Sequence, residues 1–196
     1  MIKHPSQPPK GSHNVYVTLG ASNHTEGERE ANDLYCTHPD AVRELMKLEK
    51  FSPVVLEPCA GLGHIAEALR EGGYAVVESD LLTRGRAIAQ KDVFDMAEPI
   101  MTDIVTNPPY KCATKMLRHL LDLMEDGRKM AVWLRILYLE SAERKRFFEQ
   151  YPPVRIWISS RRIPCGMNGE FGASAQGYAW FVWEKGYKGQ TTINWF

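Results

Sequence analysis

Residues 103–110, Asp-Ile-Val-Thr-Asn-Pro-Pro-Tyr, bring together an amide, two prolines and an aromatic ring. Each proline fixes φ near −65° and removes a backbone N–H. The residue before a proline is driven into an extended conformation. The segment therefore predicts a strand over 103–106 that ends at Asn107 and turns a rigid corner. That corner would present two acceptors, the Asn107 side-chain oxygen and the Pro108 carbonyl, beside the Tyr110 ring.

Two fixed acceptors and a ring suit a reaction at an amine whose lone pair is conjugated with a planar base. Such an amine is a weak nucleophile, and acceptors that hold its N–H groups would stabilise the charge that develops during the reaction. Positioning of the nitrogen in line with an electrophile would supply the remaining rate acceleration. A base stacked on an aromatic ring gains about 1–3 kcal/mol. This chemistry needs no metal, and the alternative for the motif alone is a plain loop corner with a packed tyrosine.

A second motif, Val-Leu-Glu-Pro-Cys-Ala-Gly-Leu-Gly at 55–63, predicts a strand that delivers Glu57 to a glycine turn before a helix. Small residues at such a turn let a ligand approach the backbone and the helix N-terminus. Ligands of open α/β sheets bind at this edge. The pattern is neither a dinucleotide fingerprint nor a phosphate loop, since the further glycine and the lysine are missing. Glu57 favours a cationic ligand, such as an amino-acid ammonium group.

The second strand, ending in Val-Val-Glu-Ser-Asp at 76–80, places another carboxylate at the same edge. Asp80, which lies nearer the strand end than Glu78, is the better candidate to accept both hydroxyls of a ribose. Asp92 could accept from an adenine amino group, with Val93 or Phe94 against the ring. A solvated loop carboxylate is the alternative for both aspartates.

The surrounding pattern alternates strands and helices. A βαβ unit covers 53–81, and an amphipathic helix that begins at Thr37 or Pro39 precedes it. Such alternation predicts a three-layer αβα fold with a mostly parallel, seven-stranded sheet. The remaining expected elements are a short strand or turn at 91–96, helices at 112–126 and 141–151, a strand from 129 that passes into a loop by 139, and strands at 154–159 and 179–186.

The composition is that of an ordinary globular protein. The 196 residues carry 24 basic and 24 acidic side chains, so the net charge is zero, which leaves local basic patches open. The four cysteines lack zinc-site spacing and are expected to be reduced thiols. No apolar stretch approaches the roughly 18 residues of a membrane span, so a cytoplasmic protein is expected. Residues 1–33 are expected to be flexible, and 34–196 to form one domain.

The two motifs in combination resemble a known family. Glu-Pro-x-Ala-Gly-x-Gly, followed 46 residues after Gly61 by Asn-Pro-Pro-Tyr, is similar to the class I S-adenosylmethionine-dependent amino-methyltransferases. The closest resemblance is to the DNA adenine-N6 group, particularly its small phage and bacterial members. Tyr-Cys-Thr-His-Pro-Asp at 35–40 resembles that group's Tyr-x-Thr-Pro segment, with His38 inserted. The resemblance extends over roughly residues 35–187.

The resemblance implies a Rossmann-like class I methyltransferase fold and methyl transfer from S-adenosyl-L-methionine, with S-adenosyl-L-homocysteine as product, to N6 of an adenine flipped out of DNA. It also implies a monomer or weak dimer in the cytoplasm of a bacterium or phage-infected host, without a membrane partner and without a metal. The catalytic residues would be Asn107, Pro108, Pro109 and Tyr110. The cofactor residues would be Tyr35, Thr37, Glu57, Pro58, Ala60, Gly61, Gly63, Asp80, Leu81, Asp92, Val93 and Asn107.

Nucleic-acid contacts are expected from a basic stretch at 128–162, which has nine Lys or Arg against three Glu. An ordinary solvated face is the alternative. The glycine-rich segment 161–177 is expected to be a long mobile loop that approaches the nucleic acid, because long structureless loops are often functional. The candidate nucleic-acid-binding residues are Lys111, Arg135, Arg161 and Arg162, with Arg144, Lys145 and Arg146 as further phosphate contacts.

Two other functions remain open. The same site could methylate a protein glutamine amide or a ribosomal RNA base, although the glutamine enzymes usually carry an N-terminal helical domain that about 35 polar residues cannot supply. The second open function is that of a methyltransferase-fold protein that binds DNA without catalysing a reaction. The intact Glu57, Gly61, Gly63, Asn107 and Tyr110 disfavour it.

Overall fold

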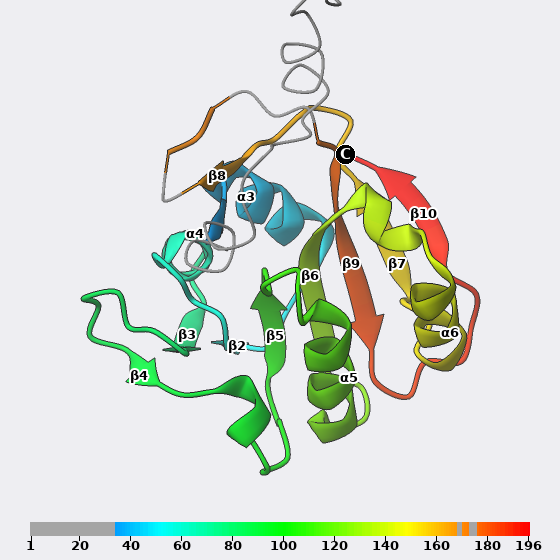
Figure 1. Ribbon diagram of the computed structural model, residues 1–196, viewed down its shortest axis with the longest axis horizontal. Helices are drawn as coiled ribbons and strands as arrows, with labels where there is room; N and C mark the ends of the chain where they lie inside the picture. The colour runs from blue at the N-terminus through cyan, green and yellow to red at the C-terminus, as the bar shows by residue number, and fades with distance from the viewer. Residues whose placement is uncertain (1–33, 168–169, 173–175) are drawn as a thin grey trace, which may run out of the picture.

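The computed structural model describes residues 34–167, 170–172 and 176–196. Within them, eight strands form one sheet in the order β10-β7-β9-β6-β5-β2-β3-β4 (Figure 1). β9 runs antiparallel to its neighbours β6 and β7, and the other pairs are parallel. The strands are β2 (Val54–Glu57), β3 (Ala75–Asp80), β4 (Ala89–Gln90), β5 (Asp103–Thr106), β6 (Lys129–Arg135), β7 (Arg155–Ile158), β9 (Tyr178–Glu184) and β10 (Thr192–Trp195).

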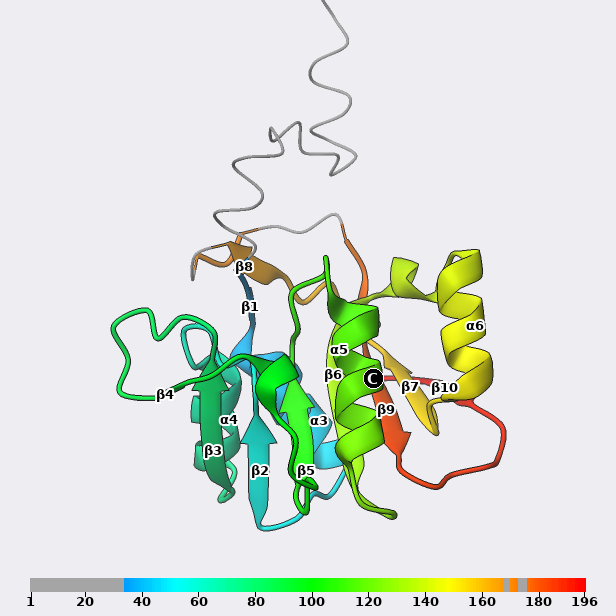
Figure 2. The ribbon, with the colours of Figure 1, turned by 60° about the horizontal axis from the view of Figure 1, so that its bottom comes forward.

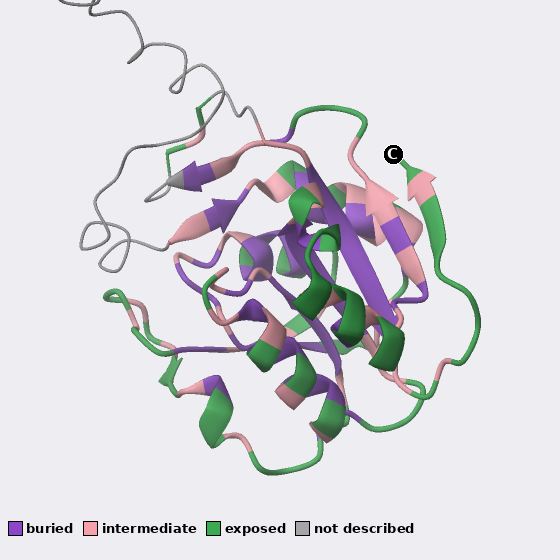
Figure 3. Cartoon of the chain, turned by 45° about the vertical axis from the view of Figure 1, so that its right-hand side comes forward, coloured by how far each residue is buried: buried purple, intermediate pink, exposed green. Residues whose placement is uncertain are grey.

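Helices cover both faces of the sheet, which confirms the three-layer αβα architecture. Successive strand residues point to opposite faces. Val105 therefore packs into the core on one face of the sheet, and Ile104 packs into the core on the other face. Figure 3 shows the buried sides of the helices turned to the sheet. The helices are α3 (Pro39–Leu48) and α4 (His64–Glu71) on one face, and α5 (Ala113–Leu123) and α6 (Ala142–Gln150) on the other.

The sheet differs from the expected seven strands in two places. An eighth strand, β10, pairs in parallel with β7 at the sheet edge, and its short exposed sequence has no apolar run that would predict it. Residues 91–96 contain a single 3₁₀ turn at Val93–Asp95, because the Asp92 side chain accepts from the Phe94 amide and caps it. The third strand instead lies just before, as β4.

A second, two-stranded sheet lies over the carboxyl ends of the parallel strands (Figure 2). β1 (Tyr35–Thr37) pairs antiparallel with β8 (Cys165–Met167), with Thr37 opposite Cys165. The segment 161–177, expected to be structureless, therefore contains a strand. Its hydrogen-bonding partner is distant in sequence, so no local periodicity predicts it. The expected flexible segment 1–33 lies outside the described residues.

Candidate functional site

Asn107 directly follows β5, at the sheet edge where the parallel strands end. Its side-chain Nδ2 donates to the Tyr35 carbonyl at 2.6 Å and to the Thr37 hydroxyl at 3.0 Å. Because a main-chain carbonyl can only accept, these bonds define which way the amide faces. The Asn107 Oδ1 is buried and accepts no hydrogen bond from the described residues. An unsatisfied buried acceptor costs about 1–3 kcal/mol, so this oxygen suits a donor that arrives with a ligand.

Tyr110 lies in a cluster of two tyrosines and one arginine. Its ring centroid is 5.4 Å from that of Tyr35, and the Arg135 guanidinium carbon lies 4.8 Å and 5.4 Å from the Tyr110 and Tyr35 centroids. Burial raises the pKa of Tyr110 well above its usual value, so the phenol stays neutral. Arg135 was predicted as a nucleic-acid contact, and the structure places it half-buried, against the two rings of the site.

The glycine turn has the predicted strand–turn–helix form. Gly61 and Gly63 have φ of 51° and 91°, in the left-handed region that favours glycine. A Cβ on Gly63 would lie 2.2 Å from a guanidinium nitrogen of Arg86, so a larger residue there would displace the Arg86 side chain and would also be strained at this φ. The Gly61 amide donates to Asp80 Oδ2 at 2.8 Å, which ties the turn to the end of β3. Pro58 and Ala60 are buried beside it.

Glu57 is buried at this turn, and the half-buried Arg86 lies near enough for its charge to act on that carboxyl. Burial raises the pKa of Glu57 well above its usual value, the negative charge of Glu78 raises it further, and the charge of Arg86 opposes both. Arg86 Nη2 donates to Glu78 at 2.6 Å. Glu57 Oε2 and Arg86 Nη1 are buried without a partner among the described residues. One open acceptor and one open donor match the ammonium and carboxylate of an amino acid.

Asp80 is buried at the end of β3, where the sequence predicted a ribose acceptor. Its Oδ1 accepts from the Leu82 amide at 2.9 Å, in addition to the bond from Gly61 to Oδ2. Each carboxylate oxygen can accept a second hydrogen bond, so Asp80 can hold the turn and still receive hydroxyl donors. The neighbouring Leu81 is exposed.

The structure separates the two predicted contacts of the adenine ring, because Val93 is buried and Phe94 is exposed. Val93 packs inside the hydrophobic core with α5, so its side chain presents little surface to a ligand. The adjacent Phe94 is 44% exposed and lies 5.7 Å from the His119 ring. Phe94, the other ring contact considered for this segment, is therefore the residue whose side chain is accessible to a ligand.

Two residues at the site were not predicted. Arg86 comes from the loop between β3 and β4, and no motif distinguishes it from other loop arginines. Phe171 contacts the rings of both His38 and His64, with centroid distances of 4.7 Å and 5.3 Å. Since His64 begins α4 directly after Gly63, Phe171 connects the 161–177 segment to the glycine turn. Only the tertiary structure brings these residues together.

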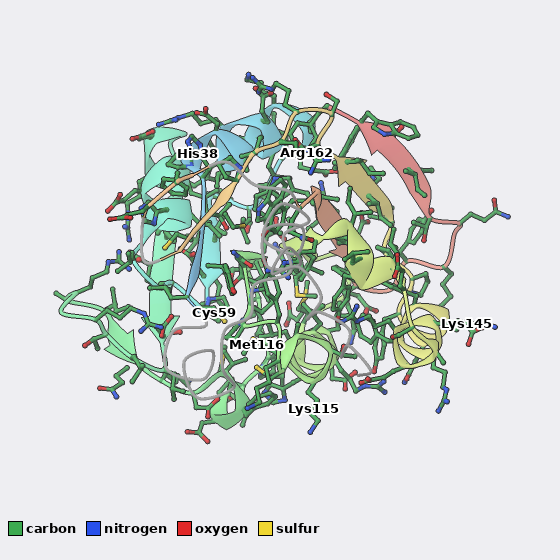
Figure 4. All side chains as sticks on the ribbon, turned by 45° about the horizontal axis from the view of Figure 1, so that its top comes forward. His38, Cys59, Lys115, Met116, Lys145 and Arg162 are labelled. Carbon is green, nitrogen blue, oxygen red and sulfur yellow. The ribbon has the colours of Figure 1, made fainter. Side chains whose placement is uncertain are left out.

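The candidate phosphate contacts are spread over the molecule. Lys111, Arg161 and Arg162 are exposed, and Arg161 lies 3.3 Å from Glu44 of α3. Figure 4 shows Arg162 on the side of α3 and Lys145 on the far side, on α6. The basic stretch 128–162 therefore does not form one patch.

Among the described residues no cluster of three or more His, Cys, Asp or Glu side chains could hold a metal ion. No helix in the same part of the chain has the length and apolar character needed to cross a membrane.

No known family profile matches the sequence, and no curated protein matches it. Solved structures do match. The type IIG restriction endonuclease BpuSI superposes with a TM-score of 0.61 at 16% identity, over 78% of this chain and 26% of that protein. The M protein of the type I restriction enzyme EcoKI superposes with a TM-score of 0.57 at 15% identity, over 80% of this chain and 45% of that protein. A SAM-dependent O-methyltransferase from Thermotoga maritima superposes with a TM-score of 0.52 at 11% identity, over 80% of this chain and 69% of that protein.

The chain has the class I methyltransferase fold. The strand order, with the antiparallel β9 inserted between β6 and β7, agrees with the expected Rossmann-like sheet. The chain spans about a quarter of the length of BpuSI and less than half of the EcoKI M protein. In this methyltransferase fold, Asn107 and the glycine turn lie together at the carboxyl edge of the sheet, where ligands of open α/β sheets bind.

Proposed function

We propose that this protein transfers a methyl group from S-adenosylmethionine to the exocyclic N6 amine of adenine in DNA. The observation that carries the proposal is the buried, unpaired Oδ1 of Asn107, whose amide nitrogen is held by β1. An acceptor prepared in this way suits an amine that must be gripped by its N–H groups. The Pro-Pro-Tyr corner that follows it has the composition expected for the DNA adenine-N6 group.

The residues at the glycine turn fit S-adenosylmethionine. When bound, this cofactor supplies an electrophilic methyl group on a sulfonium. Glu57 and Arg86 have the open acceptor and donor that its ammonium and carboxylate require, and Asp80 has acceptor capacity for ribose hydroxyls. Phe94 offers an exposed face for an adenine ring.

The chain's own residues would act by positioning and by hydrogen bonding. Asn107 Oδ1 and the Pro108 carbonyl would accept the two N–H groups of the target amine, which stabilises positive charge as the nitrogen is alkylated. Tyr35 and Thr37 would keep the Asn107 amide from rotating. Tyr110, with its raised pKa, would stay neutral and serve as a stacking surface.

Two features favour DNA over other substrates. BpuSI and the EcoKI M protein are restriction-system proteins, and the chain is similar to both in fold. The segment at 35–40, which resembles the Tyr-x-Thr-Pro segment of DNA enzymes, supplies both groups that hold Asn107. A flipped adenine would need an aromatic surface to stack on, and Tyr35 and Tyr110 lie beside Asn107 to supply one.

The test is methyl transfer from radiolabelled cofactor to duplex DNA, RNA or a protein extract. Label recovered from DNA as N6-methyladenine is expected. Label only in protein would favour the glutamine amide instead, and label in RNA a ribosomal base. Asn107→Ala should abolish transfer while the cofactor still binds, as measured by calorimetry. Cofactor binding by the wild-type protein without transfer to any substrate would favour the non-catalytic alternative.

A further inference from the structure

The turn after β6 exposes two leucines beside the site. Residues Ile136–Leu139 form a 3₁₀ helix in which Leu137 is 52% exposed and Leu139 is 38% exposed. Tyr138, between them, is buried. The alternation turns the tyrosine into the protein and both leucines to solvent. Two exposed leucines on one short turn form an apolar projection rather than part of the core.

The backbone of this turn is held on several sides. The Tyr138 hydroxyl is 2.9 Å from the Thr114 hydroxyl, and the Arg144 guanidinium carbon lies 4.4 Å from the Tyr138 ring centroid. Arg144 also donates to the Leu137 carbonyl at 3.0 Å, and the Ile136 amide donates to the Gly177 carbonyl at 2.9 Å. The leucines therefore project from a rigid support.

The projection adjoins the target-base site. Arg135, one residue before the turn, lies 4.8 Å from the Tyr110 ring. β6 is also the sheet neighbour of β5, which delivers Asn107, and the two strands run in parallel to the same edge. A duplex that places an adenine between Asn107 and Tyr110 would pass close to Leu137 and Leu139.

The surroundings suit a polyanion. Between residues 135 and 146 the chain has four basic side chains, Arg135, Arg144, Lys145 and Arg146, against two acidic ones, Glu140 and Glu143. Arg135 and Arg144 also pack on tyrosine rings, and Lys145 lies 3.6 Å from Glu149. Lys145 and Arg146 are both exposed on α6, which begins just after the turn. An apolar tip flanked by cationic residues matches a base stack with phosphates on either side, because apolar side chains can enter between bases while cations contact the backbone.

We propose that Leu137 and Leu139 form an apolar wedge that enters the duplex where the target adenine leaves its stack. The inference rests on the proposed methylation of DNA. Flipping breaks stacking and pairing, and an inserted apolar side chain occupies the gap. The wedge therefore contributes only when the adenine starts out paired and stacked. It contributes nothing to transfer from an adenine that is already unpaired.

The experiment compares single-turnover methylation of three oligonucleotides with the same sequence: a fully paired duplex, a duplex with an abasic site opposite the adenine, and the single strand. In the Leu137→Ala/Leu139→Ala variant, the rate on the paired duplex should fall about tenfold or more, and the rate on the other two should stay within about twofold. Ile193→Ala, which truncates an exposed residue of β10, is the matched control and should leave all three rates unchanged. Fluorescence of 2-aminopurine at the target position should report less flipping in the double variant.

Equal losses on all three substrates would overturn the wedge, because they would indicate a general role of the turn in the site. An unchanged rate on the paired duplex would overturn it as well. A wild-type protein that methylates none of the three DNAs would overturn the proposed function and the wedge with it. Wild-type activity combined with a substrate-independent effect of the variant overturns the wedge alone.

Discussion

The side-chain nitrogen of Asn107 lies 3.0 Å from the hydroxyl oxygen of Thr37, which joins the end of β5 to β1. Thr37 is buried, and it is paired across the small sheet with Cys165 of β8. The candidate catalytic amide is therefore tied, through one strand, to the 161–177 segment that was predicted to approach DNA. Displacement of β8 would be transmitted to Asn107 through a single hydrogen-bonded strand.

Thr37→Val should slow methyl transfer without weakening cofactor binding. Valine has the shape of threonine but accepts no hydrogen bond, so the Asn107 amide loses one of its two anchors. A hydrogen bond with a net contribution of about 0.5–1.5 kcal/mol corresponds to a drop in kcat of about two- to thirteenfold. Single-turnover rates and equilibrium binding measured in parallel test this. Thr37→Ser, which keeps the hydroxyl, should restore the rate, and a failure to do so would argue against the anchoring role.

Asp80→Ala should weaken cofactor binding and lower the melting temperature of the free protein. The carboxylate accepts from the Gly61 and Leu82 amides, so its loss leaves both donors without their partner and loosens the turn. Hydrogen bonds to charged groups contribute about 1.5–3 kcal/mol each, so a rise in Kd of at least about tenfold is expected. Calorimetric titration measures it. Asp95→Ala, at an exposed position nearby, is the control and should bind as the wild type does.

Arg86→Lys should weaken the binding of the cofactor carboxylate without affecting the binding of the other groups of the cofactor. Lysine keeps the positive charge near Glu78 but lacks the second nitrogen, Nη1, that the structure leaves without a partner. Affinity for S-adenosylmethionine should fall about tenfold, whereas affinity for its decarboxylated analogue should not change. Equal losses for both ligands would show that Arg86 acts only on the structure of the turn.

Glu57 should make cofactor affinity depend on pH. Burial raises the pKa of this carboxyl in the free protein, so the neutral form is favoured at low pH, while a cationic ammonium favours the charged form. Affinity should therefore rise as pH increases from the usual carboxyl range toward the raised pKa of Glu57, as long as the α-amino group keeps its charge. Titrations at a series of pH values should show the rise in the wild type and a flat, weaker response in Glu57→Gln.

The same substitution should stabilise the free protein at high pH. A carboxyl with a raised folded-state pKa contributes its full stability below the unfolded value and loses it as pH rises through the folded value. Glu57→Gln removes that loss, because glutamine stays neutral. The melting temperature of the variant relative to that of the wild type should then increase as pH rises above the usual carboxyl range. A relative stability that does not increase with pH would contradict the assignment.

The sequence by itself determined the strand–glycine-turn–helix unit and the strand that ends at Asn107. These features are local, since apolar periodicity, the glycines and the prolines act on neighbouring residues, and each is where the sequence predicted it. Because parallel strands end at one edge, the sequence also placed Glu57, Asp80 and Asn107 at the same side of the sheet.

The tertiary structure decided how that edge is completed. The pairing of β1 with β8, the bonds from Asn107 to Tyr35 and Thr37, and the placement of Arg86 and Phe171 join residues far apart in the chain. Their contacts depend on side-chain packing between elements, which local periodicity does not encode. For the same reason Arg135, one arginine among nine basic residues of its stretch, is distinguished only by its position against Tyr110.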